Sequence, residues 1–256
     1  MEVRILGAHS GEAGKARMTS ILIDGVLALD AGSLTASLSL VEQQKIRAIL
    51  LTHSHFDHSR DLVTLGANGA FFQSPVEVFS LAETYETVKD CLLDGKIYAD
   101  FSKWPSKDKP FLLHRIIEPL KRQNIQGYDV LPVSVQHEVA SLGFQVSRNN
   151  KSLFYTGDTG PQVVNCWQYV SPQLLLVEVS GPDTSQDYFR RIGHLSPSSL
   201  ANVLIQFRKI RQYLPQVVVI HIPPSHQREV ERGIKSVAKQ LGIRIDIGHE
   251  GMKIKV

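Results

Sequence analysis

The order of hydrophobic and polar positions along the chain predicts a mixed succession of strands and helices. Residues 2–6 alternate and predict a first strand, and residues 19–30 predict a hairpin that turns at Asp24-Gly25. Further strands are expected over residues 46–51, 128–136, 143–147, 152–155, 174–179, 216–220, 243–247 and 252–256. Helices are expected over residues 34–44, 57–65, 80–94, 197–213 and 225–241, the last with Ser225 as its N-cap. This pattern indicates an α/β protein.

One short stretch, Thr52-His53-Ser54-His55-Phe56-Asp57-His58, carries four side chains that can bind a metal. It lies between the predicted strand 46–51 and the following helix, so it forms the loop that joins them. At a strand end His53 and His55 lean to the same side, while Asp57 and His58 can point into the same space from the start of the helix. Zinc is commonly four-coordinate and keeps one position for water in catalytic sites. We therefore interpret the stretch as part of a site for two ions; the alternative is a histidine-rich polar loop.

Three more polar residues, His137, Asp158 and His221, each follow a predicted apolar strand. In an α/β sheet such strand ends gather at one rim, where sites form. The predicted ligands are His53, His55 and His137 for one ion, Asp57, His58 and His221 for the other, and Asp158 as a bridge between them. Two ions about 3.5–4 Å apart can share a hydroxide and stabilise both oxygens of a phosphoryl displacement. Imidazole and carboxylate ligands favour Zn²⁺, with Mn²⁺ and Fe²⁺ as alternatives.

Composition and charge restrict the remaining classes. The 256 residues include 28 basic and 25 acidic ones, a net charge of +3 that gives no signal for nucleic-acid binding. Cys91 and Cys166 make no disulfide framework, and each is predicted to be a free, buried thiol. No signal peptide and no apolar stretch of the ~20 residues that span a bilayer is present, so we expect a soluble cytoplasmic protein. No linker or repeat stands out, and residues 1–256 are expected to form a single domain.

Two features leave alternatives open. Asp30 closes the predicted hairpin and either orients a ligand histidine or makes the turn. The predicted loop 95–110 holds Tyr98, Phe101 and Trp104, which either stack on a substrate ring or pack the loop onto the body. Packing onto the body is the interpretation we favour.

The order of these motifs resembles the metallo-β-lactamase superfamily of binuclear metallohydrolases. The resemblance covers nearly the whole chain and includes Leu29-Asp30-Ala31-Gly32, the HxHxDH motif of 53–58, His137, Gly157-Asp158-Thr159-Gly160 and His221. It implies an αββα four-layer sandwich of two mixed β-sheets flanked by helices, with an insert at about 68–127. An aspartate at the bridging position implies a phosphodiester, thioester or lactone substrate, because the true lactamases place a cysteine there.

Finer features look most like the class II cyclic-nucleotide phosphodiesterases, near the ribonuclease Z branch. The stretch 154–161 resembles their GDTGP motif and 193–197 resembles their GHL(T/S)P motif, whereas Tyr98-Ala99 departs from a Trp-Pro pattern. The resemblance implies that a metal-bridging hydroxide opens 3′,5′-cyclic nucleotides such as cAMP or cGMP to 5′-monophosphates. It also implies catalytic roles for Asp57, for His194 as phosphate binder or proton donor to the leaving 3′-oxygen, and for Glu178 as the group that orients His194. The alternative is that His194 only caps a helix and Glu178 only makes a salt bridge.

Other functions stay open at this point. Hydrolysis of a lactone or thioester would use the same two ions, and a binding module that has lost turnover would keep the fold. Processing of RNA needs a protruding basic arm, which the sequence does not show. The expected partner is a small nucleotide, with no membrane and no strong signal for nucleic acid, and a homodimer is left open.

Overall fold

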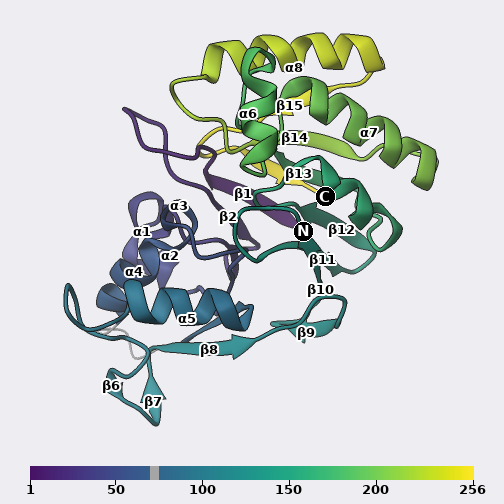
Figure 1. Ribbon diagram of the computed structural model, residues 1–256. Helices are drawn as coiled ribbons and strands as arrows, with labels where there is room; N and C mark the ends of the chain where they lie inside the picture. The colour runs from purple at the N-terminus through teal and green to yellow at the C-terminus, as the bar shows by residue number, and fades with distance from the viewer. Residues whose placement is uncertain (70–74) are drawn as a thin grey trace.

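Two β-sheets packed face to face form the centre of the computed structural model, which describes residues 1–69 and 75–256 (Figure 1). The first sheet has the order β16 (Lys253–Lys255), β1 (Glu2–Gly7), β2 (Ser20–Ile23), β3 (Leu27–Leu29), β4 (Ala48–Leu50), β5 (Val76–Ser80) and β8 (Leu112–Ile116). The second has the order β15 (Ile245–Ile247), β14 (Gln216–Ile220), β13 (Leu174–Glu178), β12 (Lys151–Tyr155), β11 (Ser141–Arg148), β10 (Tyr128–Val135) and β9 (Gln123–Ile125). A small hairpin of β6 (Pro105–Ser106) and β7 (Lys109–Pro110) projects from the body.

Helices gather on the two outer sides of the paired sheets (Figure 1). On the side of the first sheet these are α1 (Leu34–Ser37), α2 (Leu40–Gln43), α3 (Phe56–Ser59), α4 (Asp61–Gly69) and α5 (Ala82–Cys91). On the side of the second they are the 3₁₀ segments η1 (Pro161–Gln168) and η2 (Asp183–Ser185), with α6 (Gln186–Arg191), α7 (Pro197–Arg211) and α8 (Gln227–Leu241). This arrangement confirms the predicted αββα sandwich. A single domain over residues 1–256 stays a prediction.

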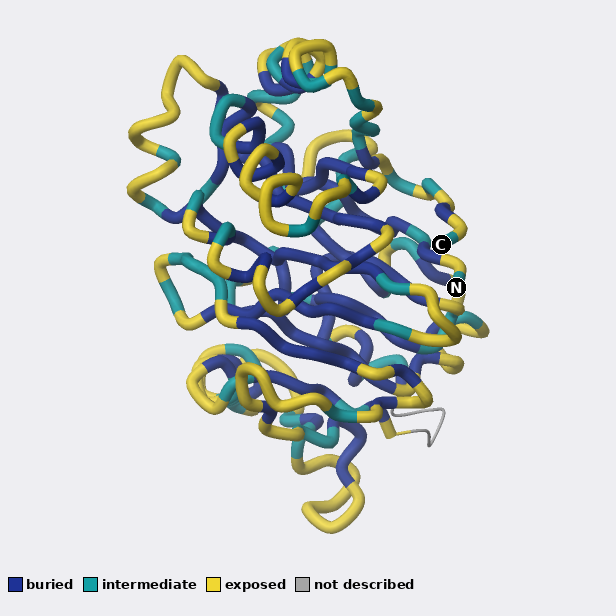
Figure 2. The backbone as a smooth tube through the Cα atoms, turned by 90° about the vertical axis from the view of Figure 1, so that its right-hand side faces the viewer, coloured by how far each residue is buried: buried dark blue, intermediate teal, exposed yellow. Residues whose placement is uncertain are grey.

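The alternation of side chains along each strand divides the core into three apolar layers. Leu29 and Leu50 of the first sheet contact the layer between the sheets, to which Phe144 and Leu176 of the second sheet also belong. The intervening residues of the first sheet pack against α1, α4 and α5, and those of the second against η1, α7 and α8. Figure 2 shows the strands as a continuous buried band between more exposed outer segments. Both faces of each sheet are therefore covered, as expected for sheets that contain parallel strands.

Parallel pairing brings the ends of several strands to one edge. In the second sheet β12, β13 and β14 are parallel, with Tyr155 opposite Leu176 and Glu178 opposite Ile220. In the first sheet β3 and β4 are parallel, with Leu29 opposite Leu50. The loops that follow these five strands carry most of the polar residues singled out from the sequence, and they meet where the two sheets face each other.

The structure corrects several predicted helix boundaries. The helix expected over 34–44 is instead two short helices, α1 and α2. Ser39 caps the start of α2 through a capping box with Glu42, and this new start separates α2 from α1. The helix expected over 57–65 begins at Phe56 and is divided at Arg60 into α3 and α4. The helix expected from Ser225 begins two residues later, with His226 as N-cap and no capping side chain.

The region expected to be an insert, 68–127, contains strands that the sequence did not indicate. Its residues 70–74 lie outside the described residues. The strands β5 and β8 complete the first sheet, and β9 ends the second. The helix expected over 80–94 is shorter, because Ser80 still belongs to β5 and α5 spans only Ala82–Cys91.

Burial tests two smaller expectations. Cys166 is buried as predicted, but Cys91 is exposed at the end of α5, so its predicted burial was wrong. Phe101 packs onto the body over Gly66, as favoured from the sequence, whereas Tyr98 and Trp104 are exposed. Among the described residues, no helix is both long and apolar enough to cross a bilayer.

Candidate metal centre

The predicted ligands come from loops at the shared edge of the two sheets. His53, His55, Asp57 and His58 follow β4 of the first sheet, the last two within α3. From the second sheet, His137 follows β10, Asp158 follows β12 and His221 follows β14. Residues up to 168 positions apart in the chain thus reach one place, because parallel strands end at the same edge of a sheet. The structure brings all seven together.

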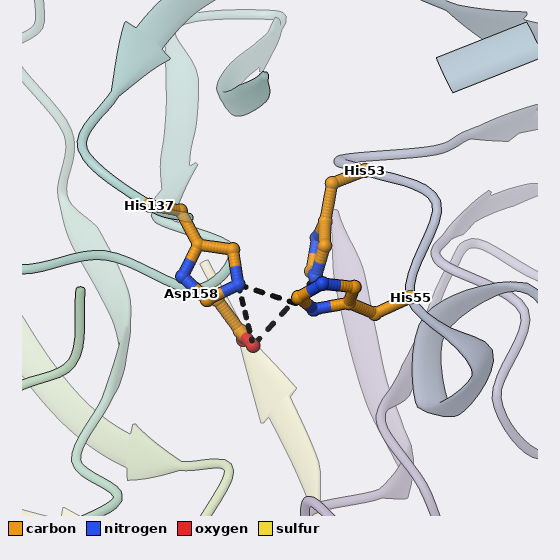
Figure 3. Close-up of side chains that lie close together, drawn as sticks. All are labelled: His53, His55, His137 and Asp158. Atoms are coloured by element: carbon orange, nitrogen blue, oxygen red, sulfur yellow. Dashed lines mark hydrogen bonds and ion pairs between the residues drawn. The ribbon is translucent and has the colours of Figure 1, made fainter. Parts of the chain in front are cut away.

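A first group of four is formed by His53, His55, His137 and Asp158, whose ligand atoms all lie within 4.8 Å of one another. Figure 3 shows the three imidazoles and the carboxylate turned toward a common point. His137 Nε2 lies 3.2 Å from His55 Nδ1 and 3.8 Å from Asp158 Oδ2, and His53 Nε2 lies 3.7 Å from the same oxygen. Three nitrogens and one oxygen are a set that zinc commonly takes.

A second group of four is formed by Asp57, His58, His221 and, again, Asp158. Asp158 Oδ1 lies 3.2 Å from both His58 Nε2 and His221 Nε2, while Asp57 Oδ2 lies 3.1 Å from His221 Nε2. The two oxygens of Asp158 therefore face different groups, Oδ2 the first and Oδ1 the second. This is the placement that a bridging carboxylate requires.

The hydrogen bonding and the protonation states of these ligand groups suit the binding of cations. Within the described part of the chain, His53 Nε2 and Asp158 Oδ1 are buried without a hydrogen-bond partner. Burial opposes ionisation of Asp158, but the neighbouring imidazoles of His221 and His58 hold the pKa of its carboxyl well below the usual range. Burial lowers the pKa of His53 well below its usual value, which leaves a neutral ring with a free lone pair. A neutral imidazole and an ionised carboxylate are the forms that bind a divalent ion.

Hydrogen bonds to the Nδ1 atoms orient two of the ligand rings that follow the first sheet. Asp30, fully buried at the end of β3, accepts a hydrogen bond from His58 Nδ1 at 2.7 Å. Thr52 donates its backbone N–H and its hydroxyl to the same carboxylate, and its Oγ1 lies 2.9 Å from His53 Nδ1. Of the two roles left open for Asp30, the structure supports the orientation of a histidine. Asp30 adopts a φ of 58°, an uncommon backbone conformation outside glycine.

The pair expected to serve proton transfer lies beside both groups. Glu178 ends β13 fully buried, and its Oε1 accepts from His194 Nδ1 at 2.8 Å. The His194 ring centroid lies 5.0 Å from that of His137 and 5.7 Å from that of His221. Gly193 permits this approach, because it adopts a φ of +75° and a Cβ there would lie 2.8 Å from His137 Cα.

The protonation state of His194 differs from that of an ordinary surface histidine. Burial alone would lower the pKa of His194, but the carboxylate of Glu178 raises it to about 9. The ring is therefore charged at neutral pH, with Nδ1–H donated to Glu178 and a second N–H on Nε2. Its side chain keeps 14% exposure, so the ring reaches the surface of the site. The catalytic roles of His194, Glu178 and Asp57 stay predictions.

Sequence reasoning did not single out Thr52, Tyr155 or Ser180, although each contacts the centre. Tyr155 donates its hydroxyl to Asp30 at 2.6 Å, and Ser180 contacts both Glu178 and His221. Thr52 adjoins the histidine cluster, and Ser180 follows Glu178 by two positions, the spacing of side chains on one face of an extended segment. That spacing was a usable signal, whereas nothing near Tyr155 in the sequence points to Asp30.

Comparisons with known proteins agree with this fold. A family model described as a beta-lactamase superfamily domain matches residues 19–222. The chain is 24% identical over 243 residues to a probable 3′,5′-cyclic-nucleotide phosphodiesterase of Yersinia pestis, covering 82% of this chain and 68% of the relative. It is 28% identical over 199 residues to a 3′,5′-cyclic-nucleotide phosphodiesterase of Schizosaccharomyces pombe, covering 67% of this chain and 54% of the relative.

Solved structures with similar folds have low sequence identity. The crystal structure of unliganded yeast PDE1 matches with a TM-score of 0.83 and 18% identity, over 100% of this chain and 99% of that one. The metallo-beta-lactamase fold protein YhfI from Bacillus subtilis matches with a TM-score of 0.78 and 15% identity, over 99% and 98% of the two chains. Together with the family match, they confirm the resemblance that the motifs predicted. The chain belongs to the beta-lactamase superfamily and has the metallo-β-lactamase fold.

Proposed function

We propose that this protein is a binuclear metal-dependent phosphodiesterase that opens 3′,5′-cyclic nucleotides to nucleoside 5′-monophosphates. The observation that carries the proposal is Asp158, whose two oxygens face two separate groups of ligand atoms, beside the His194–Glu178 pair. The two relatives named as cyclic-nucleotide phosphodiesterases support the substrate class. A homodimer and a cytoplasmic location stay predictions.

The ligand groups define what the chain itself contributes. His53, His55 and His137 would hold one divalent ion, Asp57, His58 and His221 the other, and Asp158 both. When bound, two such ions lower the pKa of a shared water and offset negative charge that develops on phosphoryl oxygens. Nitrogen-rich ligand groups favour Zn²⁺, with Mn²⁺ and Fe²⁺ as alternatives.

His194 supplies the proton that the leaving group needs. Hydrolysis opens the ring: an oxygen from water bonds to phosphorus, the bond between phosphorus and the 3′-oxygen breaks, and that oxygen must gain a proton to leave as a hydroxyl. The charged His194 donates its Nε2 proton to this oxygen, and Glu178 stabilises the charged ring and fixes its orientation through Nδ1. Because Glu178 is buried and accepts the backbone N–H groups of Thr159 and Leu195 as well, its carboxylate is held in one position.

Assays of the purified protein test the proposal. Cyclic AMP, cyclic GMP, a lactone, a thioester and a precursor tRNA are offered to the zinc-loaded protein, to protein treated with chelator, and to treated protein reloaded with zinc. We expect hydrolysis of a 3′,5′-cyclic nucleotide that is lost with chelator and returns with zinc, and two ions per chain by elemental analysis. D158A is expected to lose both ions and activity, while D129A, at an exposed aspartate far from the centre, keeps both.

The outcomes separate the alternatives. Chelator-sensitive hydrolysis of the lactone, the thioester or the RNA, with both cyclic nucleotides untouched, would reject the substrate class and keep the metal centre. Two bound ions without turnover of any substrate would indicate a binding module. Fewer than two ions in the zinc-loaded protein would reject the binuclear centre itself.

A further inference from the structure

Ser180 stands between a predicted metal ligand and the predicted proton donor. It lies just beyond the end of β13 and is 2% exposed, so its hydroxyl must find partners within the protein. Ser180 Oγ lies 2.9 Å from His221 Nδ1 and 2.9 Å from Glu178 Oε2. Two longer approaches, of 3.3 Å to His194 Nδ1 and to the His221 carbonyl oxygen, complete its surroundings.

The direction of these hydrogen bonds follows from the chemistry of the partners. His221 Nε2 faces Asp57 and Asp158, so a ring that binds a cation there keeps its lone pair on Nε2 and its proton on Nδ1. That Nδ1–H donates to Ser180 Oγ. The single hydroxyl proton of Ser180 then donates to Glu178, which as a carboxylate can only accept.

The two oxygens of Glu178 therefore hold different partners, and we call these two sets of hydrogen bonds the arms of Glu178. Its Oε1 receives the Nδ1–H of His194 directly, at 2.8 Å, and its Oε2 receives the hydroxyl of Ser180. The second arm continues to His221, which also adopts a φ of 64°, a conformation that needs support from its surroundings in a residue other than glycine.

We propose that Ser180 is a positioning residue that couples His221 to Glu178, so that one buried carboxylate orients both a metal ligand and the proton donor. The inference rests on the proposed function, because it takes His221 as a ligand. Removing the hydroxyl frees the tautomer and the rotation of the His221 ring, but leaves the bond between Glu178 and His194 in place. The loss therefore falls on the ion held by Asp57, His58 and His221 and spares the one held by His53, His55 and His137.

Zinc affinities measured with a competing chromogenic chelator test the inference without reference to activity. In S180A one of the two zinc equivalents is expected to lose roughly 10–100-fold in affinity, the usual effect of removing the hydrogen-bond partner of a ligand, while the other changes by less than about threefold. S180T keeps the hydroxyl and is expected to restore the affinity. S80A is the matched control, because Ser80 is also buried and its Oγ lies 2.7 Å from a histidine, His114, outside the centre.

Nitrogen NMR of the histidine rings adds a direct readout of the tautomer. The zinc-loaded protein is expected to show a protonated Nδ1 on His221 that exchanges slowly with solvent, and S180A is expected to lose this protection. Unchanged affinities and unchanged protection in S180A would overturn the inference, as would an equal loss at both ions. Fewer than two bound ions in the unmodified protein overturns the inference together with the binuclear centre, whereas two ions without hydrolysis of cyclic nucleotides overturns only the substrate proposal.

Discussion

Two buried carboxylates, Asp30 in the first sheet and Glu178 in the second, hold the two sides of the candidate centre in similar ways. Both are fully buried and both stand at or just beyond the end of a strand. Asp30 reaches His58 directly and His53 through the hydroxyl of Thr52. Glu178 likewise contacts one histidine directly and a second one through a hydroxyl.

The difference lies in what each carboxylate supports. The two histidines that Asp30 supports, His53 and His58, are fully buried and belong to the predicted ligands. Glu178 instead divides its hydrogen bonds between the ligand His221, through Ser180, and the partly exposed His194. The first side therefore serves ion binding alone, whereas the second side joins ion binding to proton transfer. Variants that separate the two arms test this division.

Replacing His194 is expected to give the largest effect on turnover. H194A removes the proton donor, so kcat should fall by roughly 10²–10⁴-fold, the usual contribution of a general acid, with both ions still bound. Steady-state kinetics and elemental analysis measure the two quantities. H226A is the control at a histidine that is not hydrogen-bonded to Glu178 and should keep kcat; loss of an ion in H194A would contradict the division of roles.

Replacing Asp30 is expected to affect folding and ion binding together. D30A leaves His58 Nδ1, Tyr155 OH and the Thr52 N–H buried without their acceptor, so the free energy of unfolding should fall by about 3–5 kcal/mol. Urea denaturation of the metal-free protein measures the loss, and chelator competition should show weaker binding of both ions. E178A, compared under the same conditions, should weaken only one ion; equal patterns in D30A and E178A would refute the contrast.

The Glu178 arm toward His194 also predicts a pH dependence. Because the pKa of His194 is raised from 6.5 to about 9, the bond to Glu178 stabilises the folded state fully below pH 6.5, and this stability is lost as the pH rises through about 9. The alkaline limb of kcat should lie near pH 9, with a loss of about tenfold per pH unit above it. In E178Q both the limb and the loss of stability should move to lower pH. An unmoved limb in E178Q would show that another group titrates.

The smallest expected effect belongs to Tyr155, which joins the two sheets through Asp30. Y155F removes one of several hydrogen bonds to this carboxylate, so the free energy of unfolding should fall by about 0.5–1.5 kcal/mol. Y213F removes another tyrosine hydrogen bond, to the carbonyl of Pro172, and serves as the control outside the centre. The loss of stability should be larger in Y155F, because Tyr155 is buried whereas Tyr213 is 37% exposed, and only Y155F should weaken zinc binding. Equal zinc affinities in the two variants would limit Tyr155 to a structural role.

The sequence predicted the ligand set because its residues have local signatures. Four of them share one loop, and His137, Asp158 and His221 each end an apolar run that reads as a strand. The hydrogen bonds behind the ligands have no such signature: Tyr155 reaches Asp30 across 125 positions, and only the pairing of the sheets brings them together. Within the fold, β5 was missed because Val76–Ser80 is a short run that ends two residues before α5, and the helix expected over 80–94 began at its last residue, Ser80.

The pairing of β12, β13 and β14 has a consequence for how the centre tolerates change. Glu178 opposite Ile220 and Tyr155 opposite Leu176 place Asp158, the Glu178–Ser180 segment and His221 at matching heights. Since neighbouring residues in a strand point to opposite faces, a slip of β13 by one position would turn Glu178 and Ser180 away from the centre together. A deletion in the apolar middle of β13, far from any ligand, should therefore weaken the ion held by His221 as much as the loss of Glu178 does.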